Sequence, residues 1–227
     1  MKVSTLIGLT KAWLGDGKSQ AKLGAYYLNK PHLSKLDSNN ALKWFRKAAA
    51  NGDVSALTGL GYCSYLDDNV EAALRYYEQA NEQGDAEAPY HIGLLYFAGE
   101  GVPEDLEKAF EYYSISAERK FPGAIHMIAW CYEQGAGVEP DSEKALSLWR
   151  KSAKYKIPES LCAIGSYYLK GGLVPQSNQE AYKWFYLAVE NGDEDAPKEI
   201  EELSPRMTPL EVENAKNSAK EWNAVHS

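Results

Sequence analysis

The sequence repeats one short phrase five times. A small residue follows an aliphatic one, and in four copies a tyrosine follows three positions later: Leu23-Gly24-x-x-Tyr27, Leu60-Gly61, Ile92-Gly93-x-x-Tyr96, Ile128-Ala129-x-x-Tyr132 and Ile164-Gly165-x-x-Tyr168. The steps between the central small residues are 37, 32, 36 and 36. Self-similarity at this period is typical of a solenoid, in which each unit packs on its neighbours.

A second phrase runs out of phase with the first. It begins with alanine and places aromatic residues three and four positions later in most copies: Ala41-x-x-Trp44-Phe45, Ala73-x-x-Tyr76-Tyr77, Ala109-x-x-Tyr112-Tyr113, Ala145-x-x-Leu148-Trp149 and Ala181-x-x-Trp184-Phe185. The two phrases predict a pair of helices in each unit, because apolar residues recur at helical spacing. We expect first helices at 19–29, 55–66, 87–98, 123–134 and 159–170, and second helices at 39–51, 69–83, 105–120, 141–156 and 178–191.

Glycine, proline and short polar residues mark the expected helix ends. Gly52, Gly84 and Gly192 can adopt the left-handed conformation that often ends a helix, and we expect Pro122 and Pro158 to stop helices in the other two units. Asp105, Asp141 and Ser177 can cap the helices that follow. The recurring small residue predicts close helix–helix approach, because a helical glycine costs about 1 kcal/mol relative to alanine.

The two ends depart from the repeat. Residues 1–17 read as a degenerate capping helix, since Lys11 interrupts the apolar start and no cleavage site for a signal peptide follows. Thr208-Pro209-Leu210-Glu211 is a helix start with a capping box. We therefore expect one solenoid domain over 1–227, with repeats in 18–203 and a C-terminal capping helix and tail in 204–227.

Charge and cysteine usage bound the partners and the compartment. The net charge of −8 argues against a nucleic-acid binder, which needs a basic surface. Residues 1–53 carry nine Lys and Arg against three Asp and Glu, whereas residues 81–107 carry seven acids and no Lys or Arg. That acidic stretch is either a solvated surface or a patch that attracts a basic partner. Three cysteines without paired spacing favour a cytoplasmic location, and no apolar run is long enough to insert into a membrane.

The repeat resembles a known family. The segment Ala88-x-x-x-Ile92-Gly93-x-x-Tyr96-x-x-Gly99-x-Gly101-Val102-x-x-Asp105-x-x-Lys108-Ala109-x-x-Tyr112-Tyr113-x-x-x-Ala117 resembles the Sel-one-like repeat (SLR), a relative of the tetratricopeptide repeat. The resemblance covers about residues 19–203. It implies an all-α fold: a right-handed αα-solenoid of about five helix-pair repeats with capping helices at both ends. It also implies a role as scaffold or adaptor, common in bacteria.

By analogy with tetratricopeptide arrays, the first helix of each pair lines the concave face. Its exposed positions are then three before, one after and four after the central small residue. The repeat phrase does not require these residues, and they include our candidate binding residues: Tyr62, Tyr65, Tyr90, Leu94, Phe97, His126, Trp130, Glu133, Cys162 and Ser166. Aromatic side chains facing solvent favour a protein or peptide partner. The alternative is that they pack against neighbouring units, which we favour for Leu94.

Catalytic and metal-binding patterns are sparse. The four histidines form no metal-binding pair at helical spacing, and no glycine-rich segment has the pattern of a phosphate-binding loop. A contact between His126 and Cys162 on neighbouring repeats could make a thiol nucleophile pair, although stacking alone also brings such residues together. We expect no enzyme activity, no cofactor and no metal.

Three functions from different classes remain. The first is a non-catalytic scaffold that binds a protein or peptide in an aromatic-rich concave groove, one version of which is a stoichiometric inhibitor or immunity partner of a bacterial toxin. The second, by association with a disulfide-bridged branch of the family, is a penicillin-recognising hydrolase, although this chain lacks the paired cysteines. The third is a self-assembling array, against which we expect a monomer or weak self-association.

Overall fold

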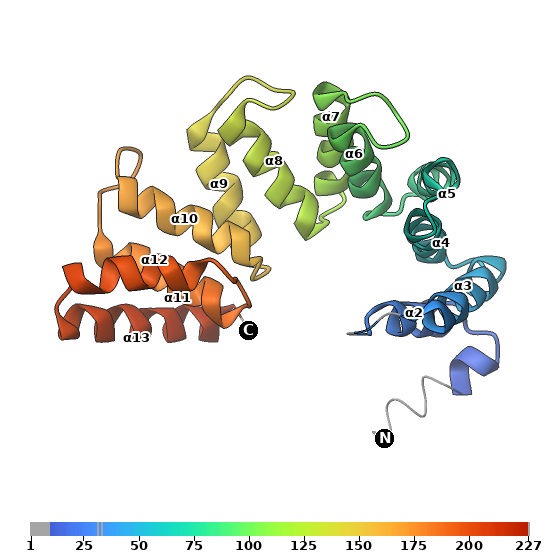
Figure 1. The fold of residues 1–227 in the computed structure, drawn as a ribbon, viewed down its shortest axis with the longest axis horizontal. Coiled ribbons are helices and arrows are strands. Elements are labelled where there is room, and N and C mark those ends of the chain that lie inside the picture. Colours follow the sequence, from blue (N-terminus) through green and yellow to red (C-terminus); the bar gives the residue numbers. More distant parts are fainter. Residues whose placement is uncertain (1–9, 31, 33, 227) are drawn as a thin grey trace. The chain divides into compact units, whose positions relative to one another are not determined.

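Helices account for the secondary structure of the residues that the structure describes. The structure is a computed structural model, and it describes residues 10–30, 32 and 34–226. No strand occurs among these residues (Figure 1). A helical turn at residues 10–13 is followed by α2 Gly17–Leu28, α3 Lys35–Ala50, α4 Ser55–Leu66, α5 Val70–Glu82, α6 Ala88–Ala98, α7 Leu106–Glu118, α8 Pro122–Gln134, α9 Ser142–Ala153, α10 Pro158–Lys170, α11 Asn178–Glu190, α12 Ala196–Leu203, the 3₁₀ turn Ser204–Arg206 and α13 Pro209–Val225.

Consecutive helices pack as five pairs: α2 with α3, α4 with α5, α6 with α7, α8 with α9 and α10 with α11. The prediction of an all-α fold made of helix pairs is confirmed. The chain forms two compact units, Met1–Arg119 and Lys120–Ser227. Helices α2 to α7 belong to the first unit, and α8 to α13 belong to the second. Our expectation of one continuous domain over 1–227 stays a prediction.

Four of the five pairs are held together by an aromatic ring that lies on the glycine of the partner helix. The rings of Phe45, Tyr77, Tyr113 and Phe185 face Gly24, Gly61, Gly93 and Gly165. A Cβ atom added to Gly93 would lie 2.6 Å from the ring of Tyr113, closer than any normal contact. The predicted close approach of the helices is therefore confirmed, and the ring explains why these positions stay small.

The helix ends follow the predicted signals in part. Gly52, Gly84 and Gly192 adopt positive φ angles of 80°, 86° and 95° after α3, α5 and α11, as predicted. The expectation that Pro122 and Pro158 stop helices is wrong, because each is the first residue of the next helix. Lys120 follows the end of α7 and Lys156 follows the end of α9. Both adopt the left-handed conformation, with φ of 67° and 59°.

The predicted N-caps are present. The side chains of Asp105, Asp141 and Ser177 accept hydrogen bonds from the backbone N–H groups three residues later, at the starts of α7, α9 and α11. These bonds satisfy backbone donors that a helix start leaves without a partner. The loop that precedes each cap is thereby fixed to the helix it introduces.

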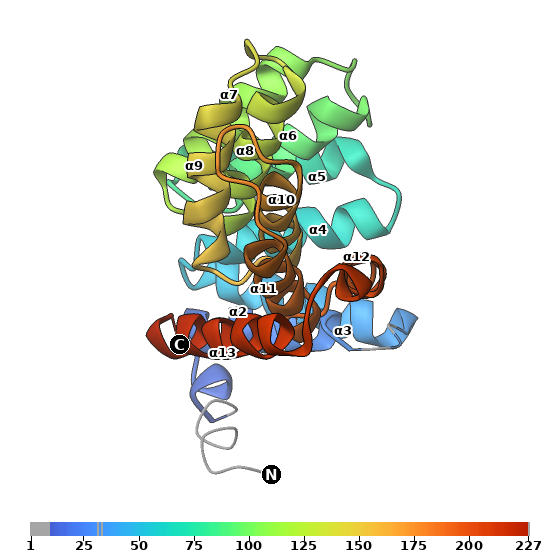
Figure 2. The same ribbon diagram turned by 90° about the vertical axis from the view of Figure 1, so that its left-hand side faces the viewer.

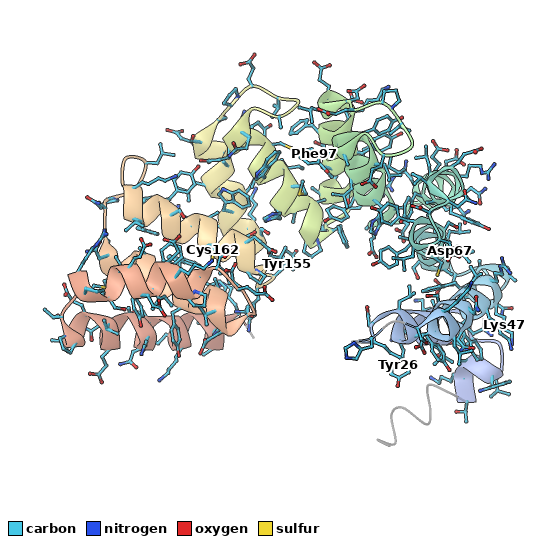
Figure 3. The ribbon with its side chains drawn as sticks, in the orientation of Figure 1. Tyr26, Lys47, Asp67, Phe97, Tyr155 and Cys162 are labelled. Atoms are coloured by element: carbon cyan, nitrogen blue, oxygen red, sulfur yellow. The ribbon has the colours of Figure 1, made fainter. Side chains whose placement is uncertain are left out.

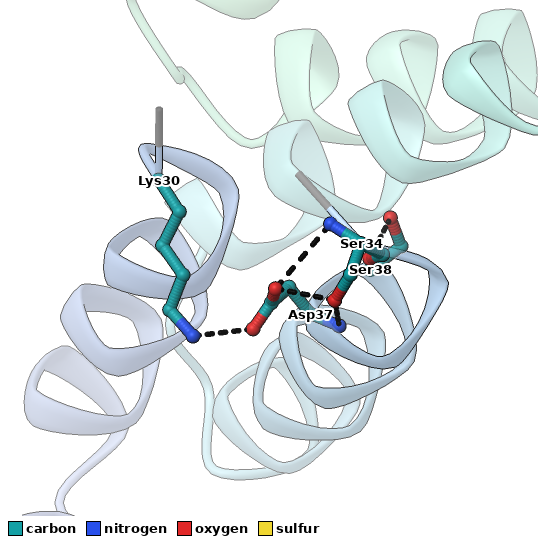
Figure 4. Close-up of polar contacts among 4 residues, drawn as sticks. All are labelled: Lys30, Ser34, Asp37 and Ser38. Carbon is teal, nitrogen blue, oxygen red and sulfur yellow. Dashed lines mark hydrogen bonds and ion pairs between the residues drawn. The ribbon is translucent and has the colours of Figure 1, made fainter. Parts of the chain in front are cut away.

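Helix α3 begins four residues before the predicted position. The Ser34 side chain accepts a hydrogen bond from the backbone N–H of Asp37, and the Asp37 carboxylate accepts one from the backbone N–H of Ser34 (Figure 4). Lys30 of the preceding segment forms an ion pair with Asp37. These hydrogen bonds from Lys30 and Ser34 hold the pKa of Asp37 below its ordinary value. The apolar stripe starts only at Ala41, so periodicity alone placed the start too late.

The C-terminal segment covers α11, as predicted for a capping helix (Figures 1 and 2). Thr208 and Glu211 form the expected capping box at the start of α13. Ala215 and Ala219 are fully buried, and the ring of Trp222 lies 5.5 Å from that of Trp184 on α11. At the other end, most of the predicted N-terminal capping helix of 1–17 lies outside the described residues. Ala12 within it is buried, and its carbonyl accepts a hydrogen bond of 2.9 Å from Gln20 Nε2.

Candidate binding pockets on the inner helices

The first unit has a pocket of about 910 Å³ on the faces of α2, α4 and α6. We call it the first-unit pocket, and its lining includes Lys22, Ala25, Leu28, Thr58, Tyr62 and His91. Apart from Phe45 and the residues between α3 and α4, its lining comes from the first helix of each pair or the residues at its ends. The helices that carry the Leu-Gly phrase therefore present the hollowed face of this unit.

The predicted residues of the first unit differ in their positions. Tyr62 lines the first-unit pocket and is 38% exposed, so it is available to a partner. Tyr65 is also exposed, and its hydroxyl donates a 2.8 Å hydrogen bond to Glu100 Oε2. Tyr90, Leu94 and Phe97 are half-buried and are not part of the pocket lining.

His91 lines the first-unit pocket, and sequence reasoning missed it. Its ring stacks on Tyr77 at 4.9 Å between centroids, lies 6.2 Å from Tyr62, and its Nε2 lies 3.3 Å from Glu87 Oε1. Helical residues advance by about 100° each, so the three positions we counted cover only a narrow sector. The position two before the central small residue, which His91 occupies, widens the counted sector of the helix circumference by about 60°. The same position supplies Lys22 and Gly59 to this pocket.

The second unit has a pocket of about 430 Å³ between α8, α9 and α10. We call it the second-unit pocket. All five candidate residues of this unit line it: His126, Trp130, Glu133, Cys162 and Ser166. Trp149 of α9 and Tyr167 of α10 complete its aromatic wall, and Ala163 comes from the position that sequence reasoning left out. The repeat spacing thus brings the five residues together, while their binding role stays a prediction.

His126 is fixed by a chain of hydrogen bonds. Its Nδ1 lies 3.0 Å from Ser160 Oγ, which donates to Ser152 Oγ at 2.8 Å, and both serines are fully buried. The imidazole ring lies 5.0 Å from the Trp149 ring. Burial lowers the pKa of His126 below its ordinary value, with Glu159 acting weakly in the opposite direction. His126 is therefore held as a neutral side chain.

Cys162 lies on α10 of the second unit (Figure 3). Its thiol donates a hydrogen bond to the Asp193 carboxylate, and its pKa is raised by burial first and then by Asp193. A nucleophilic cysteine needs the opposite, a lowered pKa that favours the thiolate. His126 and Cys162 share a pocket, but their hydrogen bonds go to Ser160 and Asp193, so this geometry does not activate the thiol.

The position three before the central small residue links neighbouring repeats. In the first unit the Thr58 hydroxyl donates to Asp85 Oδ1 at 2.9 Å, and that oxygen also caps the start of α6. In the second unit Cys162 makes the equivalent bond to Asp193, which receives the N–H of Ala196 at 2.7 Å. His126 reaches Ser160 in the same way. These inner residues therefore stabilise the stack as well as lining the pockets.

Within residues 10–30, 32 and 34–226, no group of three His, Cys, Asp or Glu side chains is placed to hold a metal ion. No helix among them is both long and apolar enough to cross a bilayer. The three cysteines are free.

Two solved structures share this fold. A protective antigen from uropathogenic Escherichia coli with an SLR fold superposes with a TM-score of 0.74 at 24% identity, over 96% of this chain and 48% of that one. A Sel1 repeat protein from Oxalobacter formigenes superposes with a TM-score of 0.72 at 23% identity, over 92% of this chain and 89% of that one. At these identities the likeness shows the fold alone.

A curated plant protein is similar over part of its length. The ERAD-associated E3 ubiquitin-protein ligase component HRD3B of Arabidopsis thaliana is 33% identical over 97 residues, which are 40% of this chain and 15% of the plant protein. This chain therefore spans a small part of that relative. The Sel1 repeat itself matches five times, at residues 17–53, 54–85, 86–121, 122–154 and 158–193. These five matches include all five helix pairs, and the chain belongs to the Sel1 repeat family.

Proposed function

We propose that this protein is a non-catalytic scaffold that binds a protein or peptide segment on the inner faces of its first helices. Sel1 repeat proteins are generally protein-interaction scaffolds. The observation that carries the proposal is that both units have a pocket on the same helices of the repeat, and most of its lining comes from positions outside the two repeat phrases. A pocket on the same helices of the repeat in both units suits a protein or peptide partner rather than a single small substrate.

The lining of the pockets supports a protein partner. Tyr62, His91 and Trp130 offer large rings with polar edges, the residue types that bind partners with little loss of side-chain entropy. The plant relative is by its name a component of a ubiquitin-ligase assembly, which agrees with a scaffold. For the penicillin-recognising alternative, the Cys162 thiol is not an activated nucleophile, since burial and Asp193 raise its pKa.

Photo-crosslinking tests this proposal. A photoreactive phenylalanine analogue replaces Tyr62 or Ser166 in the pockets, and matched controls carry it at Tyr26 or Tyr155, which are exposed, line neither pocket and are labelled in Figure 3. We expect irradiation in the native lysate to join one partner to the pocket variants at one-to-one stoichiometry. The control variants should give no such product.

A binding variant completes the test. Tyr62→Ala/Trp130→Ala should release the partner, while Tyr26→Ala/Tyr155→Ala should retain it, with circular dichroism confirming that both variants fold. Crosslinks from the control positions alone, or equal capture by both double variants, would place the partner outside the pockets and refute the proposal.

A further inference from the structure

The second-unit pocket combines aromatic walls with a volume suited to one large side chain. Trp130 and Tyr167 are half-buried, whereas the Trp149 ring is 97% buried and so forms a rigid floor. A volume of about 430 Å³ lies within the range of about 300–1,000 Å³ that is usual for ligand pockets. The pocket is thus a preformed aromatic recess.

Carboxylates surround this recess. Glu133 of α8 and Glu159 of α10 belong to its lining, and Lys170, which is exposed, is the lysine of the lining. The Tyr167 hydroxyl donates a hydrogen bond to Glu133 Oε2, which holds this carboxylate at the wall. A carboxylate can accept about four hydrogen bonds, so Glu133 keeps most of its capacity for a ligand.

Further carboxylates act on Cys162, which belongs to the lining of this pocket. The pKa of the Cys162 thiol is raised by burial and then by Asp193, Glu199 and Glu159. Ionisation at this position is therefore opposed by three carboxylates, which means that an anion entering beside Cys162 would meet the same repulsion. The first-unit pocket differs, because Lys18 and Lys22 balance Asp53 and Glu87 in its lining.

The protein already uses the same recognition chemistry within its own chain. Lys144 Nζ lies 5.2 Å from the centroid of the Tyr132 ring and 3.2 Å from Asp141 Oδ2. Lys108 repeats this arrangement with Tyr96 at 5.2 Å and Asp105 at 3.3 Å. A cation between an aromatic face and a carboxylate is favoured by both interactions. The second-unit pocket offers both kinds of group.

We propose that the second-unit pocket binds the guanidinium group of an arginine side chain in the partner segment, stacked on Trp130 and paired with Glu133, while Glu159 adds negative charge to the same lining. This inference rests on the proposed scaffold function and names the chemistry of one partner side chain. Arginine fits better than lysine, because its planar group stacks on rings and can donate two parallel hydrogen bonds to one carboxylate. An apolar side chain would bury Glu133 without a cation, which is unfavourable.

Nuclear magnetic resonance with a small probe tests the pocket directly. N-acetyl-arginine methylamide is titrated into the ¹⁵N-labelled full chain, and the indole N–H signals of its six tryptophans are followed. We expect saturable shifts for Trp130 and Trp149, while Trp13 and Trp44 in the first unit stay in place. The uncharged citrulline analogue, which has nearly the same shape, and the glutamate analogue should cause no saturable shift.

Charge-neutral variants then test the carboxylates. Glu133→Gln and Glu159→Gln should each weaken arginine binding by about two- to fivefold, the size expected of a partly exposed ion pair. Lys170→Gln should strengthen it by a similar factor. Glu213→Gln, at an exposed position of α13, is the matched control and should change nothing. The three Glu→Gln variants keep the side-chain volume, and an unchanged indole spectrum excludes loss of folding in all four variants.

The outcomes separate this inference from the scaffold proposal. Equal shifts with citrulline, binding of the glutamate analogue, or arginine affinity unchanged in both Glu variants would each overturn the arginine pocket. If a partner still crosslinks at Ser166 in that case, the scaffold proposal stands and this inference alone fails. Saturable arginine binding that depends on Glu133 and Glu159 would support the pocket, even if crosslinking finds no partner on the inner face.

Discussion

At the scale of single residues, some side chains of the inner face both line a pocket and stabilise the contact between repeats. His126 lines the second-unit pocket and hydrogen-bonds the buried Ser160 of the next repeat. Cys162 lines that pocket and hydrogen-bonds Asp193. A substitution at either residue therefore changes stability as well as binding.

The free energy of unfolding should decrease at acidic pH, and part of this decrease should depend on His126. Because burial lowers the pKa of His126 in the folded protein, the unfolded chain binds a proton that the folded chain resists. The stabilising contribution is full above the ordinary pKa of 6.5 and is lost as the pH falls below it. Urea unfolding at pH 7.5 and 5.5 should show a smaller loss of unfolding free energy for His126→Phe than for the wild type. Equal losses would contradict a buried neutral imidazole.

The cysteines should react slowly with thiol reagents. Burial raises the pKa of both Cys63 and Cys131 to about 11, and burial with Asp193 raises the pKa of Cys162. At pH 8 the thiolate fraction of each is therefore small. We expect little reaction with Ellman's reagent in the native protein and three thiols per chain in denaturant. Rapid modification of one native thiol would show that its helix opens.

At the scale of helices, four of the five pairs have an aromatic ring packed against a glycine of the partner helix. The sequence predicted this close approach, and it predicted α4 at its observed bounds of 55–66. It did not predict the start of α3, where Asp37 replaces the usual glutamate of a capping box, or the left-handed Lys120 and Lys156, since lysine carries no signal for that conformation. For the pockets, repeat spacing located the second-unit residues but missed His91, because we counted too few helical positions.

Exchanging alanine and glycine at the central position should destabilise the protein in either direction. Gly93→Ala gains about 1 kcal/mol of helix propensity, but its Cβ would lie 2.6 Å from the fully buried Tyr113 ring. Overpacking of this kind costs about 1–3 kcal/mol, so we expect a net loss of about 1 kcal/mol. Ala129→Gly should lose about 1 kcal/mol through propensity. Chemical denaturation measures both, and a stabilised Gly93→Ala would show that Tyr113 moves aside.

At the scale of the whole molecule, the two units differ in their cores. Among the described residues, the core of the second unit is one cluster that extends from Ala129 to Ala219. Two separate clusters of buried residues occur in the first unit, one around Phe45 and one around Tyr77. In a repeat protein, stability is approximately the sum of terms from the single repeats and from the contacts between neighbours. The second unit, whose core is continuous, should therefore unfold locally less often than the first.

Hydrogen exchange should reveal this difference. We expect peptides from α10 and α11 to be the most protected, because α11 packs against α10, α12 and α13. Peptides from α2 and α3 should exchange faster under the same conditions. Mass spectrometry at several exchange times measures both in one sample. Uniform protection of all helices would mean that the whole chain unfolds as a single cooperative unit.

The C-terminal helix also restricts how such a protein can change in length. Since α13 packs on α11, a further helix pair added after it has no free helix of the array to stack on. Duplication of an internal segment of 36 residues, by contrast, preserves every contact between neighbouring pairs. Gene duplications should therefore accumulate inside the array, and an engineered longer version should be built by internal insertion rather than by fusion at the end.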